Sequence, residues 1–138
     1  MGLKITLKPG ERMIIDGAVI TNGDTKCTLV VENRVPILRP KDILKEEEAN
    51  SPARRIYFAI QLMYIDPENQ SRYHPHYWEL IKDFVQAAPS STGLATEISD
   101  CILKGNFYKA LKITQKLICY ETEILNRVQK STISIPDC

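Results

Sequence analysis

The sequence lacks the short motifs by which common catalytic and cofactor sites are recognised. Its 138 residues contain no nucleophile elbow G-x-S-x-G, no phosphate loop G-x-x-x-x-G-K-S/T, no dinucleotide fingerprint G-x-G-x-x-G and no zinc-protease H-E-x-x-H. Each motif places backbone amides, a nucleophile or metal ligands at the spacing that its chemistry requires. We therefore expect no enzymatic activity and no bound cofactor.

Long apolar runs and closely spaced cysteines are also absent from the sequence. No window approaches the eighteen or so apolar residues of a membrane helix, and the first residues contain no run of signal-peptide length. The four cysteines lie far apart, which indicates neither a zinc knuckle nor a disulfide framework. They are Cys27, Cys101, Cys119 and Cys138. We expect a cytoplasmic protein without membrane contact.

Histidine is scarce, and its placement does not favour a metal site. Both histidines, His74 and His76, lie in the aromatic segment 73–78. Side chains two residues apart share a face only in an extended segment, and no nearby cysteine completes a ligand set. The acidic run Glu46 to Glu48 lacks the spacing of a calcium loop. We expect no metal ion and interpret segment 73–78 as the packed start of a helix.

The overall charge is nearly balanced, but its distribution is uneven. The formal net charge is +1, which excludes the strongly basic signature of a generic polyanion binder. The first 45 residues carry 8 Lys and Arg against 5 Asp and Glu, whereas the remainder carries 10 against 12. Any contact with RNA is therefore expected to be local and to lie in the first third of the chain.

Apolar and polar residues alternate through the first forty positions, as they do in strands with one buried face. Turn residues divide this part into about five strands of an antiparallel meander, near 3–8, 12–15, 18–21, 26–32 and 35–39. Asn22-Gly23 is the strongest hairpin signal because both residues tolerate a positive φ. Pro36 cannot donate to a ladder, so the last strand is expected at an edge.

The rest of the chain shows the apolar spacing of four helices. They are expected over 52–65, about 75–88, about 94–104 and 107–129. Ser51 is an N-cap before Pro52, and Gly105 suits a left-handed helix cap. The tail 131–138 is expected to be frayed. The predicted fold class is α+β, with a β-meander domain over 1–45 and a four-helix body over 46–138.

Basic residues are the main functional signal on the predicted sheet. They are Lys4, Lys8, Arg12, Lys26, Arg34, Arg39 and Lys41. Charges of this kind protect strand edges from aggregation, or they contact phosphates. Arg54 and Arg55 lie in the first turn of a helix, where cations are unfavourable. This placement indicates an acidic partner, a phosphate, or a bridge to the Glu46 to Glu48 run.

Several runs in their order along the chain resemble one family, that of the flagellar biosynthesis repressor FlbT. The runs are Leu7-Lys8-Pro9-Gly10-Glu11, Asn22-Gly23-Asp24, Leu38-Arg39-Pro40-Lys41-Asp42-Ile43, Ser51-Pro52-Ala53-Arg54-Arg55-Ile56-Tyr57-Phe58 and Gly105-Asn106-Phe107-Tyr108-Lys109-Ala110-Leu111-Lys112. The resemblance implies a cytoplasmic post-transcriptional regulator that associates with the 5′ untranslated region of flagellin mRNA and influences its translation or decay. It also implies a partner, either a FlaF-like flagellin regulator or flagellin, and leaves the sign of control open.

A fainter likeness concerns residues 3–43 alone, which are similar to the carbon-storage regulator family of RNA-binding proteins. The runs Ile5 to Glu11, Met13 to Ile15 and Leu38 to Ile43 carry this likeness. That family reads exposed GGA-type loops with its first and last strands. The likeness implies RNA contacts at Lys8, which replaces an arginine, and at Arg39.

Two hypotheses follow from these observations. In the first, the strands face RNA, and the candidate contacts are Lys4, Lys8, Arg12, Arg39, Lys41, Arg54 and Arg55. In the second, the chain is a protein-binding adaptor or chaperone whose helices hold the partner, with only an indirect effect on RNA. The candidate partner contacts are Phe107, Tyr108 and Leu111. An edge strand at 3–8 or 35–39 also offers a route to a homodimer by sheet extension.

Overall fold

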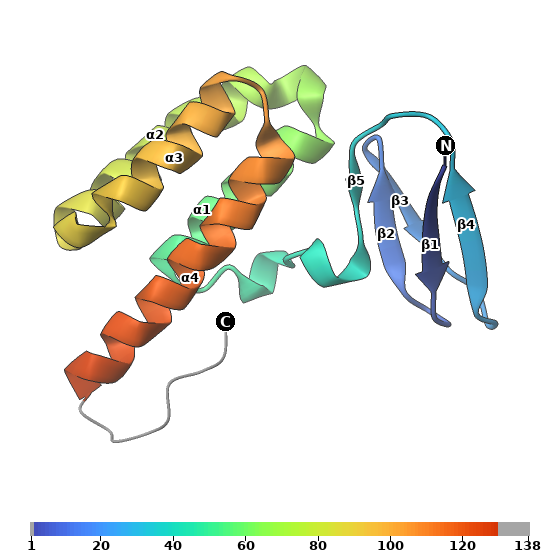
Figure 1. Cartoon of the computed structure of the whole chain (residues 1–138), viewed down its shortest axis with the longest axis horizontal. Coiled ribbons are helices and arrows are strands. Elements are labelled where there is room, and N and C mark those ends of the chain that lie inside the picture. Colours follow the sequence, from blue (N-terminus) through green and yellow to red (C-terminus); the bar gives the residue numbers. More distant parts are fainter. Residues whose placement is uncertain (1, 130–138) are drawn as a thin grey trace.

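Five short strands precede four helices in the computed structural model, which describes residues 2–129 (Figure 1). The strands are β1 Leu3–Leu7, β2 Arg12–Ile15, β3 Ala18–Thr21, β4 Cys27–Val31 and β5 Ile37–Leu38. The helices are α1 Pro52–Ile65, α2 Gln70–Ala87, α3 Thr92–Leu103 and α4 Phe107–Gln129. Short 3₁₀ turns are η1 Pro40–Asp42, η2 Glu46–Glu48, η3 Pro67–Asn69 and η4 Pro89–Ser91. The predicted α+β class and the strand count are confirmed.

The strands pair in two small antiparallel sheets and not in one continuous meander. One sheet holds β1 and β4, and the other has the order β3-β2-β5. The tight hairpin turn is Asp16-Gly17, where both residues have a positive φ, 50° and 84°. Strand β3 does not pair with β4, so the hairpin predicted at Asn22-Gly23 is wrong.

The Asn22 side chain forms hydrogen bonds between loops at the point where the chain passes from one sheet to the other. Its side-chain amide donates to the carbonyl oxygens of Leu7, Lys8 and Thr25 at 3.2, 2.9 and 2.9 Å. These three bonds tie the end of β1 to the loop before β4. The asparagine therefore holds two loops together and does not form the turn of a two-residue hairpin.

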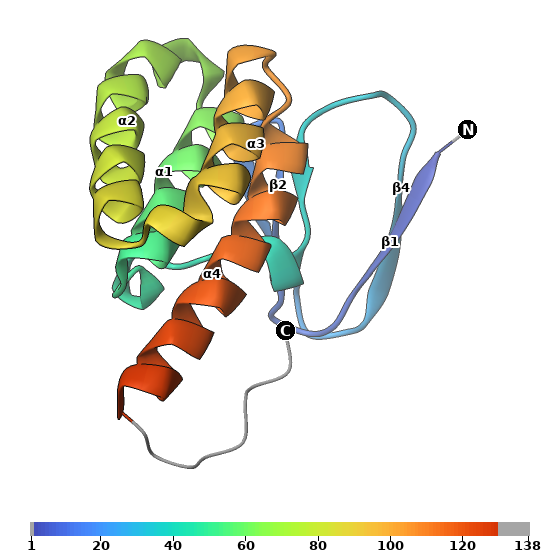
Figure 2. The ribbon, with the colours of Figure 1, turned by 60° about the vertical axis from the view of Figure 1, so that its left-hand side comes forward.

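Strand β2 lies between two cores because successive side chains point to opposite faces. Met13 is buried with Ile5 and Leu7 between the two sheets. Ile14 and its cross-strand neighbour Leu38 pack instead into the core of the helices. The β1–β4 pair thus lies on the side of the three-stranded sheet that is remote from the helices (Figure 2).

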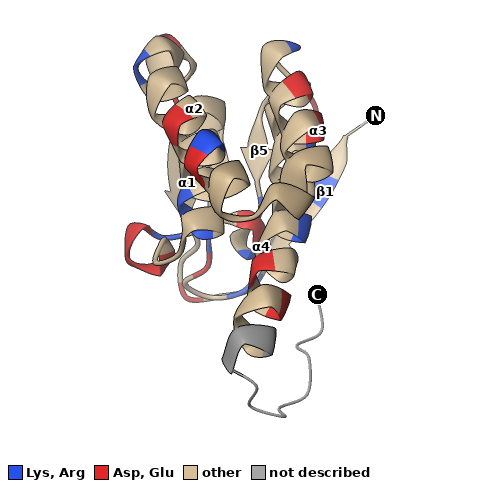
Figure 3. Ribbon diagram, turned by 90° about the vertical axis from the view of Figure 1, so that its left-hand side faces the viewer, with Lys and Arg blue, Asp and Glu red and all other residues tan. Residues whose placement is uncertain are grey.

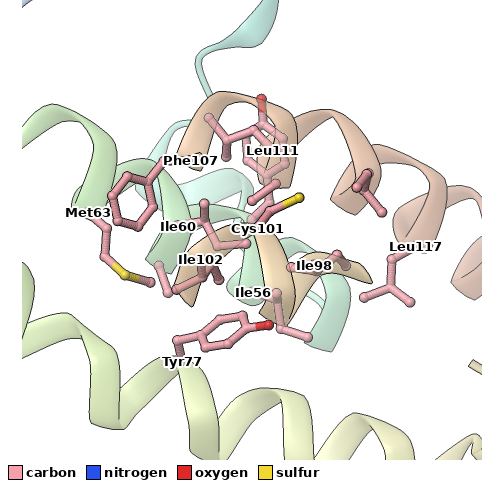
Figure 4. Packing of buried hydrophobic residues seen from close by; sticks show 14 of the residues in the cluster. Ile56, Ile60, Met63, Tyr77, Ile98, Cys101, Ile102, Phe107, Leu111 and Leu117 are labelled. Atoms are coloured by element: carbon pink, nitrogen blue, oxygen red, sulfur yellow. The ribbon is translucent and has the colours of Figure 1, made fainter. Parts of the chain in front are cut away.

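The helical body is built around α1, which packs against α2 and α4, while α3 packs against α4. Ser51 caps α1 by accepting the N–H of Arg54 at 3.3 Å, and the buried Glu121 of α4 accepts the N–H of Ala53 at 2.9 Å. Figure 4 shows aliphatic and aromatic side chains from all four helices meeting in one core. Helix α3 spans Thr92–Leu103, where about 94–104 was predicted, and Gly105 just after its end has the φ of 77° expected of a left-handed helix cap.

Helices α1 and α4 have the predicted bounds, whereas α2 begins five residues before the predicted start at Pro75. Pro75 lies inside the helix with its ring exposed, so it removes one backbone hydrogen bond near the helix start without disturbing a packed surface. Two tyrosines hold this first part of α2. The Tyr73 hydroxyl donates to Asp66 at 2.8 Å, and the Tyr77 ring is fully buried. The tail 131–138 lies outside the described residues.

Candidate nucleic-acid interface

The exposed face of β1 carries a row of polar side chains that ends beside η1. Lys4, Thr6 and Lys8 are exposed, while Ile5 and Leu7 between them are buried. This face borders a surface depression of about 420 Å³, which we call the basic depression. Its charged lining residues are Lys4, Lys8, Lys26, Arg39, Lys41 and Glu11. The structure therefore brings together four of the seven predicted RNA contacts, and adds Lys26.

Positive charge dominates the basic depression, with five cations against one carboxylate. The carboxylate, Glu11, is used locally because its Oε1 accepts the backbone N–H of Lys8 at 2.7 Å across the Pro9-Gly10 turn. Within residues 2–129, the recorded ion pairs are Lys104 with Asp100 and Lys112 with Asp42. None of the five cations is paired there, so their charge is available to an external anion.

The segment that carries Arg39 and Lys41 is fastened to the helical body through Asp42. The Asp42 carboxylate is buried and accepts Lys112 Nζ from α4 at 2.9 Å. The Tyr57 hydroxyl of α1 donates to the Asp42 carbonyl oxygen at 2.6 Å. Gln61 then bonds both the N–H and the carbonyl oxygen of Leu44 at 2.8 Å. These contacts fix one wall of the basic depression to the helices.

Burial and charge shift the pKa values of the groups around Asp42. Burial, and secondarily the Asp42 charge, raises the pKa of Tyr57 to about 12. For Lys112, burial alone lowers the pKa, but hydrogen bonds to Asp42 and Tyr108 outweigh it, and the pKa lies above its usual value. Lys112 is therefore charged at neutral pH and compensates the buried carboxylate. The Asp42 Oδ2 atom has no hydrogen-bond partner within the described residues.

A second and smaller hollow of about 260 Å³ lies between the strands and the helices, and we call it the aromatic pocket. Its lining residues are Leu3, Val35, Ile37, Arg39, Tyr64 and Tyr108. The Tyr64 hydroxyl accepts the N–H of Ile37 at 3.0 Å, and Tyr108 is 40% exposed. Arg39 lines both this pocket and the basic depression.

Three predicted RNA contacts lie away from the basic depression. Arg12 is exposed on β2 and is not among its lining residues. Arg54 donates to the side-chain oxygen of Asn50 at 3.4 Å, and Arg55 borders a groove on the helical body. The ion pairs recorded within residues 2–129 include no bridge from these arginines to the Glu46 to Glu48 run.

The predicted partner contacts on α4 separate into core and surface. Phe107 and Leu111 are buried, at 9% and 1% exposure, and their side chains lie in the helical core (Figure 4). They face the same way as Ala110 because residues three and four apart share a helix face. Their assignment as partner contacts is therefore corrected, and Tyr108 is the residue of the three that remains exposed.

The helical body has two apolar surfaces that sequence reasoning missed. One is a groove of about 460 Å³ whose apolar lining is Pro52, Leu80, Phe84, Ala87, Ala88, Ile124 and Leu125. The other lies between α2 and α3, where Trp78 and Val85 of α2 and Leu103 of α3 are among the lining residues. Leu103 is 72% exposed. The apolar spacing of a helix in the sequence does not show which of its apolar residues a neighbouring helix covers. The ribbon in Figure 3 marks Asp and Glu positions on several helices of the body.

The described residues give no indication of a metal centre or a membrane span. They contain no group of three or more His, Cys, Asp or Glu side chains that can hold a metal ion. His74 and His76 lie on α2, where residues two apart diverge by about 200° around the helix axis. Cys27 and Cys101 are free thiols. Among residues 2–129, no helix has the length and apolar content needed to cross a bilayer.

Comparison with known proteins shows which family the sequence matches. The sequence profile of the family described as "Flagellar protein FlbT" matches residues 3–125. A probable flagellum biosynthesis repressor protein FlbT 1 of Bradyrhizobium diazoefficiens is 47% identical over 125 residues, which cover 90% of this chain and 85% of the relative. A probable FlbT repressor of Rhodopseudomonas palustris is 43% identical, covering 92% of this chain and all of the relative. The flagellum biosynthesis repressor protein FlbT of Caulobacter vibrioides is 36% identical, covering 93% and 92%. No solved structure matches the chain.

Proposed function

The chain belongs to the FlbT family, and on this premise we propose that it binds the 5′ untranslated region of flagellin mRNA and so controls translation or decay of the message. The relatives are named as repressors of flagellum biosynthesis, and the chain is accordingly a regulator of flagellar synthesis. The proposed site of action is the cytoplasm, where the message is translated. A repressor name describes regulation and not catalysis.

The observation that carries the RNA proposal is the basic depression. The basic depression is lined by five cations and by one carboxylate, although the whole chain is almost neutral. None of these cations forms an ion pair within residues 2–129. Such a local concentration of Lys and Arg suits phosphates, and regulatory RNA recognition favours single-stranded loops whose backbone can enter a concave surface. Residues 1–45 are thus proposed as the RNA-facing part and residues 46–138 as the partner-binding part.

Charge reversal tests the proposal directly. Purified Lys8→Glu and Arg39→Glu variants, and the double variant, are titrated with a flagellin leader RNA in a gel-shift assay. We expect the double variant to lose retention of the RNA while its circular dichroism spectrum stays unchanged. Lys82→Glu with Lys109→Glu is the matched control, because it changes the net charge equally on exposed helical positions. Equal binding by both double variants would refute the RNA proposal.

A second candidate function is that of an adaptor or chaperone, and the two apolar surfaces of the helical body favour it. Apolar patches that are rimmed by polar residues are typical of protein-interaction sites. The partner of this candidate is a FlaF-like flagellin regulator or flagellin itself. Binding of purified partner together with no affinity for leader RNA at physiological salt would select it over the first proposal.

A homodimer is also proposed, through sheet extension. The two-stranded β1–β4 sheet has one unpaired edge on each strand, and β3 and β5 are the edges of the other sheet. An unpaired edge presents backbone donors and acceptors that a second copy can complete. Sedimentation velocity of the full chain over a concentration series decides between a monomer and this dimer.

A further inference from the structure

We propose that the aromatic pocket receives one unstacked base of the bound RNA, while the basic depression beside it holds the adjoining phosphates. The proposal rests on the RNA-binding function proposed above and assigns it a specificity element. Its structural basis is Arg39, which lines both hollows. A nucleotide bound at Arg39 therefore has its phosphate on one side and its base on the other.

The chemistry of the aromatic pocket suits a base. Its lining combines the apolar residues Leu3, Val35 and Ile37 with the aromatic residues Tyr64 and Tyr108. None of its lining residues is acidic. Bases that are splayed out of a single strand stack on aromatic side chains and on Arg guanidinium planes, which are the two groups present here.

The size of the aromatic pocket limits its occupant. Its volume of about 260 Å³ is below the ~300–1,000 Å³ of clefts that hold drug-sized ligands. An RNA helix does not fit, because a base enters such a hollow only after it has left its stack. The proposed ligand is therefore a loop or single-stranded nucleotide and not a duplex.

The two tyrosines that line the aromatic pocket are held in position before any ligand binds. Lys112 Nζ lies 5.1 Å from the centroid of the Tyr108 ring, and the same ammonium group is held by the buried Asp42. The Tyr64 ring lies 6.2 Å from that of Tyr108, and its hydroxyl is bound to the backbone of Ile37. The Tyr64 ring is thus fixed at its hydroxyl, and the Tyr108 ring packs against the anchored Lys112 ammonium, which reduces the entropy that a ligand loses on ordering them.

Three substitutions at one exposed position test the base pocket. Tyr108→Phe keeps the ring, Tyr108→Leu keeps an apolar side chain without a ring, and Tyr108→Ala removes both. Stacking on an aromatic side chain is lost on alanine substitution at a cost corresponding to roughly 5- to 150-fold in affinity. We expect this loss for Tyr108→Ala and Tyr108→Leu, and an affinity within about twofold of the parent protein for Tyr108→Phe.

The probe is a single-stranded flagellin leader RNA, compared with the same sequence annealed to its complement. Tyr108→Ala should weaken single-strand binding while leaving the slope of log K against log salt unchanged, because no phosphate contact is removed. The thermal unfolding midpoints of Tyr108→Ala and Tyr108→Leu are compared with that of Tyr108→Phe. Similar midpoints show that a loss of RNA affinity is not caused by unfolding.

Each contrary result has a distinct meaning. If the parent protein binds RNA and Tyr108→Ala binds it equally well, the base pocket is refuted and the proposed function stands. If Tyr108→Leu retains full affinity, an apolar contact and not a base stack fills the pocket, which also overturns the proposal. Loss of partner-protein binding with unchanged RNA binding would assign the pocket to a protein. If the parent protein binds no RNA, both the pocket and the proposed function fail.

Discussion

At the scale of single residues, Asp42 connects the strands with the helices. It lies in the run Leu38 to Ile43, which carries both family resemblances, yet its role as a buried acid could not be predicted. Its charge partner Lys112 is 70 residues away in the sequence. Alternation and helical spacing describe near neighbours, so a pair between distant elements appears only in the fold. The basic character of Arg39 and Lys41, by contrast, was evident from sequence.

Lys112→Met should destabilise the protein by about 1–3 kcal/mol. The substitution leaves the Asp42 carboxylate, 3% exposed, without its counter-ion, and breaking a fully buried pair costs about 3–5 kcal/mol. The expected loss is smaller because the Lys112 side chain is 36% exposed. Urea unfolding at pH 7 measures the difference.

Lys109→Met is the matched control for this measurement, since Lys109 is exposed on the same helix. It should change the free energy of unfolding by less than about 0.5 kcal/mol. The Lys112 contribution is complete below its ordinary pKa and is lost as the pH rises through its raised folded-state pKa. A Lys112→Met variant as stable as the control at pH 7 would contradict the anchoring role of Asp42.

The buried tyrosines predict a loss of stability at alkaline pH. Burial raises the pKa of both Tyr57 and Tyr77 to about 12, whereas unfolded tyrosine titrates near 10. Between these values the folded protein binds more protons than the unfolded chain, so the free energy of unfolding falls as the pH rises. The expected fall is on the order of 2 kcal/mol for each tyrosine.

Tyr57→Phe isolates one of the two contributions. The variant should lose stability less steeply between pH 10 and 12 than the parent protein, although it starts from a lower value because the bond to Asp42 is gone. Urea unfolding at several pH values in this range, with tyrosinate absorbance near 295 nm, gives both quantities. Identical pH dependence in the two proteins would show that Tyr57 ionises freely in the folded state.

At the scale of elements, sequence patterns predicted which elements form better than how they pair. Alternation located β1, turn residues on either side delimited β2 and β3, and caps with apolar spacing located α1 and α4 at their observed bounds. The pairing in two sheets was not predictable, because Asn22-Gly23 and Asp16-Gly17 are both good turn dipeptides. The choice between them depends on tertiary contacts of Asn22 and on the close approach of Gly17 to α1.

Gly17→Ala should be the more destabilising of two matched glycine substitutions. Gly17 and Gly10 both have a positive φ, 84° and 76°, which costs an alanine roughly 1–2 kcal/mol. A Cβ atom at Gly17 also lies 2.8 Å from the carbonyl oxygen of Ile65, whereas nothing lies within 4 Å at Gly10. We expect Gly17→Ala to cost about 1–3 kcal/mol more than Gly10→Ala.

Denaturant unfolding of these two variants compares them under the same conditions. The contact of Gly17 with Ile65 joins the β2–β3 turn to the end of α1. If Gly17→Ala and Gly10→Ala are equally stable, the turn is free to move away from α1. The strands and helices would then be less tightly joined than the structure indicates.

At the scale of the whole molecule, charge and apolar surface are divided between the two parts of the chain. The strands and η1 carry the basic depression, and the helical body carries two apolar surfaces. The uneven charge was predictable from the sequence, but the placement of Arg12, Arg54 and Arg55 outside the depression was not. Whether an exposed residue lines the depression depends on how the strands and helices pack. The sequence pattern does not predict this packing.

The central claim is that cations of the basic depression contact RNA phosphates, and the salt dependence of binding tests it most directly. Each phosphate contact to a single strand contributes about −0.7 to the slope of log K against log salt. Titration of leader RNA over a salt series should therefore give a slope for Lys8→Gln with Arg39→Gln that is shallower by about 1.4 than that of the parent protein. Lys82→Gln with Lys109→Gln should keep the parent slope. Equal slopes and equal affinities for all three proteins would contradict the claim.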